Sequence, residues 1–262
     1  MEKKIHIDGV AETMLQTLFA RAYETQKKHP KIQDRKAVEI VNALDYDFHD
    51  AKKDLAMRSG VIARTILLDR FCEHYFQTHK DITVINIACG LDTRCYRLKG
   101  YTQWYNLDLE ETMSIRRRFF QESDCIHQIS ASCLEQDWTK QIKPTSNILI
   151  IIEGLLMYFT KEQVLTLCKI LDKGFDHMEL ILESMSCFVV SHVKEKSIDK
   201  SNAKFQWGMD DGRELSKQIP SFKHCYDISL IEGMKELLPI YKLLAHSKKI
   251  HNLSNKLCIY QK

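Results

Sequence analysis

Short apolar, β-branched runs alternate with amphipathic segments along most of this chain, and this alternation limits the possible folds. Five buried strands are expected, at residues 83–89, 102–109 and 125–130, at the start of 147–159, and at 178–184. Helical spacing separates them at 111–123 and at 160–173, where Thr160 and Gln163 form a capping-box pattern. Strands that alternate with helices predict an α/β fold with a mostly parallel, doubly wound sheet.

Helical patterns precede this alternation, and further elements follow it. Helices are expected at residues 10–28, at 34–44 with Asp34 as N-cap, and at 52–79 with a turn near Ser59 and Gly60. A last helix is expected near 229–238, and an antiparallel pair of strands near 240–246 and 255–261. No Gly/Ser-rich linker occurs in the 262 residues. We therefore expect one compact unit with an N-terminal helical cap, residues 1–80, and a core, residues 81–262.

The overall charge argues against several kinds of partner. A net charge of +3 is too small for a typical nucleic-acid-binding protein. Short basic runs such as Arg116-Arg117-Arg118 are expected to be solvated surface. No apolar run approaches the roughly 20 residues of a membrane span, and the N-terminus lacks the pattern of a secretory signal. The expected location is the cytoplasm.

The nine cysteines and eleven histidines are scattered along the chain. No C-x-x-C pair occurs, and no spacing matches a zinc site. We expect free thiols, most of them packed as small apolar side chains, and no metal.

Small or acidic residues stand where three of the expected strands end. The first strand ends at Ala88-Cys89-Gly90, the second at Asp108 and the fourth at Glu153. Small residues allow a backbone to approach a ligand closely, and an acid after the second strand is placed to accept hydrogen bonds from ribose hydroxyls. Because ligands of such sheets bind at the carboxyl ends of the strands, one nucleoside-containing ligand accounts for all three positions.

The same stretches resemble a known family. The segments "VINIACGLDTRCYRL", "WYNLDLEETMSIRRRFF", "ASCLEQDW" and "IIEGLLMYFTKEQVLTLCKIL" are similar to successive motifs of the leucine carboxyl methyltransferase family. The similarity is strongest to its bacterial branch of tetracenomycin-type polyketide O-methyltransferases, and it runs from about residue 12 to about residue 245. It implies S-adenosylmethionine (SAM) as cofactor and a class I methyltransferase fold, with a seven-stranded sheet whose last strand is antiparallel and with an N-terminal helical cap.

The resemblance also implies roles for individual residues. Gly90 and its neighbours would approach the methionine part of SAM, Asp108 with Leu109 would meet the ribose, and Glu153 would lie near the amino group. Cys133 and Leu134 would lie against the adenine, and Arg64 would pair with the carboxylate, with Arg58 as an alternative. The candidate catalytic residues are Glu153 and Tyr158, and Tyr23 and Trp207 are further aromatic candidates for the substrate lip.

Two positions depart from the family pattern. The family usually has glycine at the position of Ala88, and an added methyl group beside the cofactor either is tolerated or weakens SAM binding. Its eukaryotic branch has aspartate at the position of Cys133, whose thiol is a weak hydrogen-bond partner. The adenine amino group would then depend on the backbone or on Glu135.

The leading hypothesis is therefore a SAM-dependent O-methyltransferase that acts on a small molecule. No His/Asp pair is marked as a general base, which favours a carboxylate acceptor over a hydroxyl. The alternatives are methylation of a protein or peptide carboxylate, a nicotinamide-dependent oxidoreductase, and a SAM-binding protein without catalytic activity. The sequence leaves the acceptor and the oligomeric state open.

Overall fold

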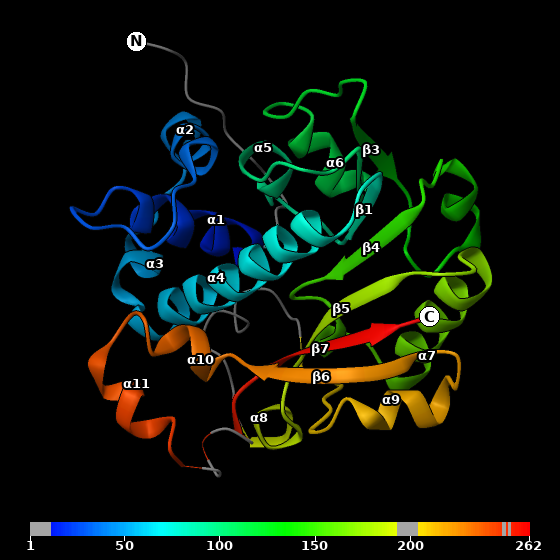
Figure 1. Ribbon diagram of the computed structural model, residues 1–262. Helices are drawn as coiled ribbons and strands as arrows, with labels where there is room; N and C mark the ends of the chain where they lie inside the picture. The colour runs from blue at the N-terminus through cyan, green and yellow to red at the C-terminus, as the bar shows by residue number, and fades with distance from the viewer. Residues whose placement is uncertain (1–11, 193–203, 248–249, 251–252) are drawn as a thin grey trace.

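The sheet has the strand order of the expected fold. The computed structural model describes residues 12–192, 204–247, 250 and 253–262. In this part of the chain seven strands form one sheet in the order β3-β2-β1-β4-β5-β7-β6, with helices on both faces (Figure 1). The strands are β1 Ile82–Ile87, β2 Gln103–Asp108, β3 Ile126–Ser130, β4 Asn147–Ile152, β5 Glu179–Ser184, β6 Lys223–Ser229 and β7 Lys256–Gln261. Only β7 runs antiparallel to its neighbours, as the family resemblance predicted.

In the described part of the chain the helices are α1 Glu12–Thr25, α2 Arg35–Ala43, α3 His49–Lys53, α4 Leu55–Thr78, α5 Arg94–Arg97, α6 Glu110–Arg116, η1 Gln136–Gln141, η2 Leu156–Tyr158, α7 Lys161–Gly174, α8 Cys187–His192, α9 Arg213–Gln218, α10 Ile231–Met234 and α11 Pro239–Leu244. Side-chain caps mark the starts of three of these helices, α2, α4 and α7. Asp34 accepts a hydrogen bond from the N–H of Ala37, and Thr160 and Gln163 make both bonds of a capping box, so both predicted caps are confirmed. No helix in the described ranges is long and apolar enough to cross a membrane.

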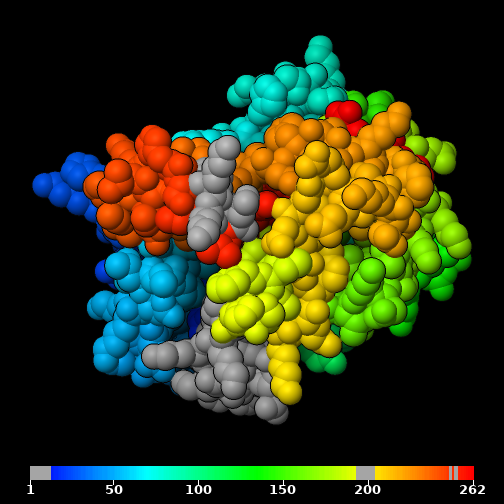
Figure 2. Space-filling model, turned by 90° about the horizontal axis from the view of Figure 1, so that it is seen from below, coloured from blue at the N-terminus to red at the C-terminus, as the bar shows by residue number. Residues whose placement is uncertain are grey.

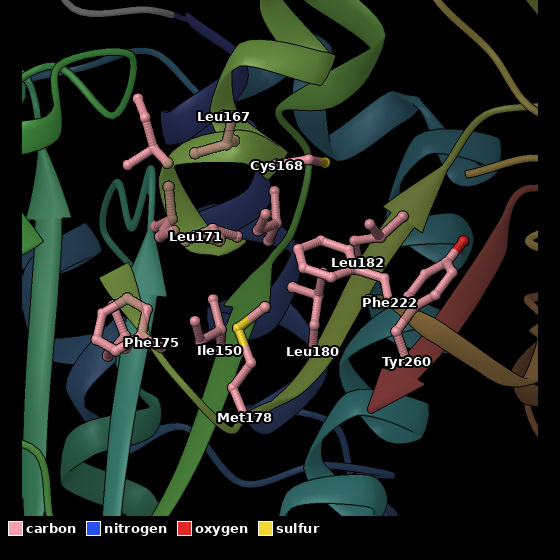
Figure 3. Close-up of a cluster of buried hydrophobic side chains, with 14 of the residues drawn as sticks. Ile150, Leu167, Cys168, Leu171, Phe175, Met178, Leu180, Leu182, Phe222 and Tyr260 are labelled. Carbon is pink, nitrogen blue, oxygen red and sulfur yellow. The ribbon is translucent and has the colours of Figure 1, made fainter. Parts of the chain in front are cut away.

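Alternation along the strands builds a core on each face of the sheet. In β4, Ile148, Ile150 and Ile152 face one cluster, whereas Leu149 and Ile151 face the other. The first cluster is closed by α7 and by the aromatic rings of Phe222 and Tyr260 (Figure 3). A central strand that is apolar on both sides is therefore buried on both sides, as expected for a parallel sheet.

The cap helices pack over the carboxyl ends of the strands. Helix α4 lies along one face of the sheet and contributes Leu68, Phe71 and Tyr75 to its core. Helices α1 and α2 form a further cluster with Leu91, which follows β1. The C-terminal part of the chain also contacts the cap. Helix α10 packs on α4, and the adjoining α11 lies near the start of α4 (Figures 1 and 2). The division of the chain at residue 80 stays a prediction.

The expected strand near 240–246 was wrong. That segment is the helix α11, which begins at Pro239, and β7 pairs antiparallel with β6, residues 223–229, on one side and with β5 on the other. Proline at the first position of a helix has a suitable φ and lacks only an N–H that would be unpaired there. Strand β6 is a half-exposed edge strand with many polar residues, so its sequence lacks the apolar run that marks the central strands.

Three expected helices have different limits. The segment 52–79 divides at Asp54, whose side chain accepts a hydrogen bond from Met57 N and caps α4, and α4 continues without a turn through Gly60. Helix α6 ends at Arg116, well before residue 123, and α10 covers only four residues of 229–238. Within the first expected helix, residues 10 and 11 lie outside the described part of the chain.

Candidate active site

A cavity of about 780 Å³ lies where β1, β2, β4 and β5 end beneath the cap helices. Its wall includes six of the nine predicted catalytic and cofactor-binding residues: Arg64, Ala88, Gly90, Asp108, Glu153 and Tyr158. Leu109, Cys133 and Leu134 are not among the described residues that line it. The carboxyl ends of neighbouring parallel strands meet at one edge of the sheet, which explains why positions so far apart in sequence share one cavity.

The turn after β1 has an unusual backbone. Ala88 has φ 54° and Gly90 has φ 49°, both in the left-handed region that glycine adopts readily. The amide of Cys89, between them, donates to Leu107 O at 3.1 Å. A Cβ atom on Gly90 would lie 3.3 Å from Met14 Cγ in α1. The cap therefore covers the turn closely, and a side chain at position 90 would be strained by the backbone conformation and would have to displace Met14.

Asp108 joins this turn to the end of β2. Its Oδ2 accepts from the N–H of Gly90 at 2.8 Å, and its Oδ1 accepts from the N–H of Leu109 at the same distance. Burial raises the pKa of Asp108 above its ordinary value, although these two amides oppose the shift. The Thr112 side chain also hydrogen-bonds this carboxylate. A carboxylate can accept about four hydrogen bonds, so the group retains capacity for a ligand hydroxyl at the cavity wall.

A chain of buried charges lies at the ends of β4 and β5. Arg64 Nη1 donates to Glu183 Oε2 at 2.7 Å. Arg64 Nε lies 2.6 Å from Glu153 Oε1, which is an ion-pair contact although its angle is not that of a hydrogen bond. Arg94 Nη1 donates to Glu153 Oε2 at 2.5 Å and to Asp92 Oδ2 at 2.8 Å. Both glutamates thus face guanidinium groups at the edge of the cavity.

These contacts decide the protonation of Glu153. Burial alone would raise the pKa of Glu153, but Arg94 and then Arg64 outweigh it and hold the pKa below its ordinary value. Burial also lowers the pKa of Arg64, and Glu183 and Glu153 outweigh it and raise that pKa. Glu153 is consequently an ionised acceptor of hydrogen bonds at neutral pH and is poorly suited to take up a proton.

The three remaining predicted cofactor residues lie outside the cavity wall. Leu109 is 52% exposed, directly after Asp108. Cys133 and Leu134 are half-buried and pack against the core on one face of the sheet. Burial raises the pKa of the Cys133 thiol to about 12, so it stays protonated. Their contacts with adenine remain predictions.

Only one of the aromatic candidates lines the cavity. Tyr158 does so, with its ring 5.7 Å from that of Phe205. Tyr23 instead lines a second, smaller cavity, where the guanidinium carbon of Arg58 lies 4.4 Å from the centre of its ring. Trp207 packs against the core. Arg58, the alternative partner for the cofactor carboxylate, is therefore placed elsewhere, among the second cavity's residues.

Several residues of the site were not recognised in the sequence. Glu183 is a charge near the carboxyl end of an otherwise apolar strand, much as Glu153 directly follows one, and this pattern was a signal for it. The roles of Asp92 and Arg94 depend on contacts with Glu153 and Asp69, which lie far away in sequence. The residues next to Asp92 and Arg94 in the sequence do not indicate these distant partners.

The fold and the site together define a class I SAM-dependent methyltransferase. The carboxylate at the end of β2, the small residues Ala88 and Gly90 and the acid at the end of β4 line one cavity, and their chemistry is compatible with SAM. Among the described residues, no group of three or more His, Cys, Asp or Glu is arranged to hold a metal ion.

Comparison with known proteins identifies the family. The profile of the leucine carboxyl methyltransferases matches residues 14–172, and the chain belongs to this family. It is 26% identical to the tetracenomycin polyketide synthesis O-methyltransferase TcmP of Streptomyces glaucescens, over 89% of this chain and 87% of that protein. It is 28% identical to the S-adenosyl-L-methionine-dependent methyltransferase dpfgK of Gibberella zeae, over 84% of this chain and 82% of that one. The chain is thus a SAM-dependent methyltransferase with SAM as cofactor, rather than a nicotinamide-dependent oxidoreductase.

Solved structures support the fold. A candidate methyltransferase of Thermobifida fusca YX superposes with a TM-score of 0.57 at 12% identity, covering 93% of this chain and 94% of that one. Magnesium protoporphyrin IX methyltransferase of Synechocystis PCC 6803 gives a TM-score of 0.51 at 9% identity, covering 89% and 100%. At such identities the likeness concerns the fold alone.

Proposed function

We propose that this protein transfers the methyl group of SAM to an oxygen atom of a small-molecule acceptor. The observation that carries the proposal is the composition of the cavity at the ends of β4 and β5. Beyond the charged groups of Glu153 and Glu183, the segments that follow these strands contribute apolar and aromatic side chains to the wall: Met157, Tyr158, Met185, Val189 and Phe205. This end adjoins the acids assigned to the cofactor, so an apolar acceptor bound there would lie next to the methyl group.

The residues at the β1 and β2 ends would hold the cofactor. SAM, when bound, supplies an already activated methyl group, and the protein has mainly to align the reactants and exclude water. Asp108 would accept hydrogen bonds from the ribose hydroxyls, and the backbone at Ala88 and Gly90 would pass close to the methionine part. Glu153 would accept from the amino group while it keeps its contacts with Arg64 and Arg94.

The acceptor oxygen that fits best is a carboxylate. No histidine or lysine occurs among the described residues that line the cavity, and Glu153 and Glu183 both contact Arg64. A carboxylate is ionised at neutral pH and needs no base, whereas a hydroxyl gains from one. The name of the relative TcmP supports oxygen as the atom that is methylated. Tyr158, as the phenol in the wall, would orient the acceptor.

The experiment is transfer from SAM with a labelled methyl group to a panel of acceptors. The panel contains apolar aromatic acids, the corresponding phenols and alcohols, and a peptide with a free C-terminal leucine. Mild alkali releases labelled methanol from a methyl ester but leaves an ether intact, so the product distinguishes the two kinds of oxygen. We expect label in alkali-labile ester of a small acid.

The other outcomes would contradict the proposal in different ways. Label on the peptide carboxylate alone would favour a protein substrate. Label on nitrogen or sulfur would overturn transfer to oxygen. Tight SAM binding with no transfer to any acceptor would favour a binding protein without catalytic activity.

A further inference from the structure

The turn after β1 contains a single glycine, and hydrogen bonds to its carbonyl groups hold its conformation. The turn, residues 88–93, has left-handed φ angles at Ala88 and Gly90. Its carbonyl oxygens at Gly90, Leu91 and Asp92 all accept hydrogen bonds from arginine side chains. These arginines come from two different helices on either side of the turn.

Arg116 supplies two of the three hydrogen bonds. Its Nη1 donates to Gly90 O and to Asp92 O, each at 2.8 Å. The side chain is 0% exposed, and its guanidinium carbon lies 3.9 Å from the centre of the Phe120 ring. The expectation that this basic run is solvated surface was therefore wrong for Arg116. Sequence could not show this, because the acceptors are backbone atoms in another segment.

Arg21 supplies the third hydrogen bond from the cap. Its Nη2 donates to Leu91 O at 2.8 Å, while its Nε contacts Asp34 Oδ2 at 3.0 Å. Asp34 Oδ2 also accepts from the hydroxyl of Thr93 at 2.5 Å. Helix α1 and the start of α2 are thus bonded directly to the cofactor turn.

Gly90 is held by both ends of one short segment. Its N–H donates to Asp108, the last residue of β2, two positions before α6, and its carbonyl accepts from Arg116, the last residue of α6. The N–H and the carbonyl belong to the two peptide groups that flank the Gly90 Cα atom, so neither peptide group can rotate without breaking one of these bonds. The conformation of the turn at Gly90 is therefore coupled to the position of Asp108, the residue assigned to the ribose.

We propose that Arg116, assisted by Arg21, is a positioning residue that sets the cofactor turn in the conformation that binds SAM. In this protein, buried guanidinium groups hold the turn through its carbonyl oxygens. The proposal depends on SAM as cofactor and is independent of which acceptor is methylated. Arg116 does not itself line the cavity, so it acts through the turn.

The test compares Arg116→Met and Arg116→Lys with Arg117→Met. Arg117 is the matched control, since its side chain is 45% exposed and pairs with Glu110 at the surface. Calorimetric titration with SAM and with S-adenosylhomocysteine gives Kd, and initial rates at saturating SAM give kcat. We expect Arg116→Met to raise Kd at least about tenfold, equivalent to about 1.4 kcal/mol, with kcat within about threefold of wild type.

Arg116→Lys should recover part of the affinity, because an ammonium group retains the charge and can donate to a carbonyl but lacks the planar guanidinium group that packs on the Phe120 ring. Arg117→Met should bind SAM as wild type does. If Arg116→Met does not fold, the Lys variant and Arg21→Lys carry the test, each with an expected rise in Kd. Folded Arg116 variants that unfold at lower temperature yet bind SAM with unchanged Kd would show a merely structural role and overturn the proposal. A fall in kcat at unchanged Kd would overturn it as well.

Discussion

The carboxylate of Asp108 accepts a hydrogen bond of 2.8 Å from the backbone N–H of Gly90, which links the ends of β2 and β1 across the edge of the sheet. The second carboxylate oxygen is held by the N–H of Leu109. Both oxygens are therefore fixed in place by the protein itself. An acid that is oriented in advance loses little further freedom when it binds a ligand, which favours affinity.

Replacement of Asp108 by asparagine should weaken SAM binding roughly ten- to hundredfold, because a hydrogen bond to a charged group contributes about 1.5–3 kcal/mol. The amide keeps the size of the side chain but presents only one oxygen. Calorimetric titration with S-adenosylhomocysteine measures the effect. Asp124→Asn, at an exposed acid, is the control and should leave Kd unchanged. An Asp108→Asn protein with wild-type affinity would remove Asp108 from the cofactor site.

Ala88→Gly should stabilise the protein. Ala88 has φ 54°, and a left-handed conformation costs a residue with a Cβ atom about 1–2 kcal/mol. Glycine removes this cost but adds about 0.4–1 kcal/mol of entropy to the unfolded chain, so a net gain of about 0.5–1 kcal/mol is expected. Urea unfolding of both proteins measures it, and SAM titration shows whether the methyl group of Ala88 weakens binding. A lower unfolding free energy for the glycine variant would contradict the argument from strain.

The central part of the fold was predictable because its signals are local. Strand β4 is apolar at every position from Ile148 to Ile152, and the capping box at Thr160 lies within four residues. Strand β6 and helix α11 were not predictable in this way. Strand β6 takes its structure from pairing with β7 at the sheet edge, and α11 begins at a proline whose role depends on its position in the fold.

In the candidate site, too, some residues have a local signal in the sequence and others depend on distant contacts. Asp108 and Glu153 were found because each charge stands where a strand ends, and the sheet brings such positions together. The burial of Arg116 was missed, since a basic residue in a run of three has the local pattern of a solvated surface. Its partners are carbonyl groups of the turn after β1. Every residue has a backbone carbonyl, so the sequence does not indicate which of them accepts a hydrogen bond.

The stability of the cap should depend on pH through Asp34. Burial raises the pKa of Asp34, but the charges of Arg21 and Arg97 outweigh it and hold the pKa below its ordinary value. A carboxyl with a lowered pKa stabilises the folded state at pH above the unfolded pKa of about 3.9, and this contribution is lost as the pH falls through the folded pKa. Asp34→Asn should therefore cost about 3–5 kcal/mol at pH 7, as for a broken buried ion pair.

The difference between wild type and Asp34→Asn should then shrink as the pH is lowered below about 4. Urea unfolding at several pH values measures it. Asparagine caps helices as well as aspartate does, so loss of the α2 cap does not confuse the result. Asp45→Asn, at an exposed acid, should change stability by less than about 0.5 kcal/mol. Parallel stability curves for wild type and Asp34→Asn would show that the Asp34 ion pairs are not the cause.

Two glycines at the crossing of α4 and α10 should respond in opposite directions to alanine. A Cβ atom on Gly233 would lie 2.4 Å from the carbonyl oxygen of Ala63, a backbone atom that cannot move aside. Gly233→Ala should therefore destabilise the protein by about 1–3 kcal/mol or more, as overpacking does. A Cβ atom on Gly60 meets nothing nearer than Met234 Cε at 3.9 Å, so Gly60→Ala should add about 0.5–1 kcal/mol of helix stability. Denaturant unfolding of the two variants measures both signs, and an equal loss in both would show that the helices do not cross as described.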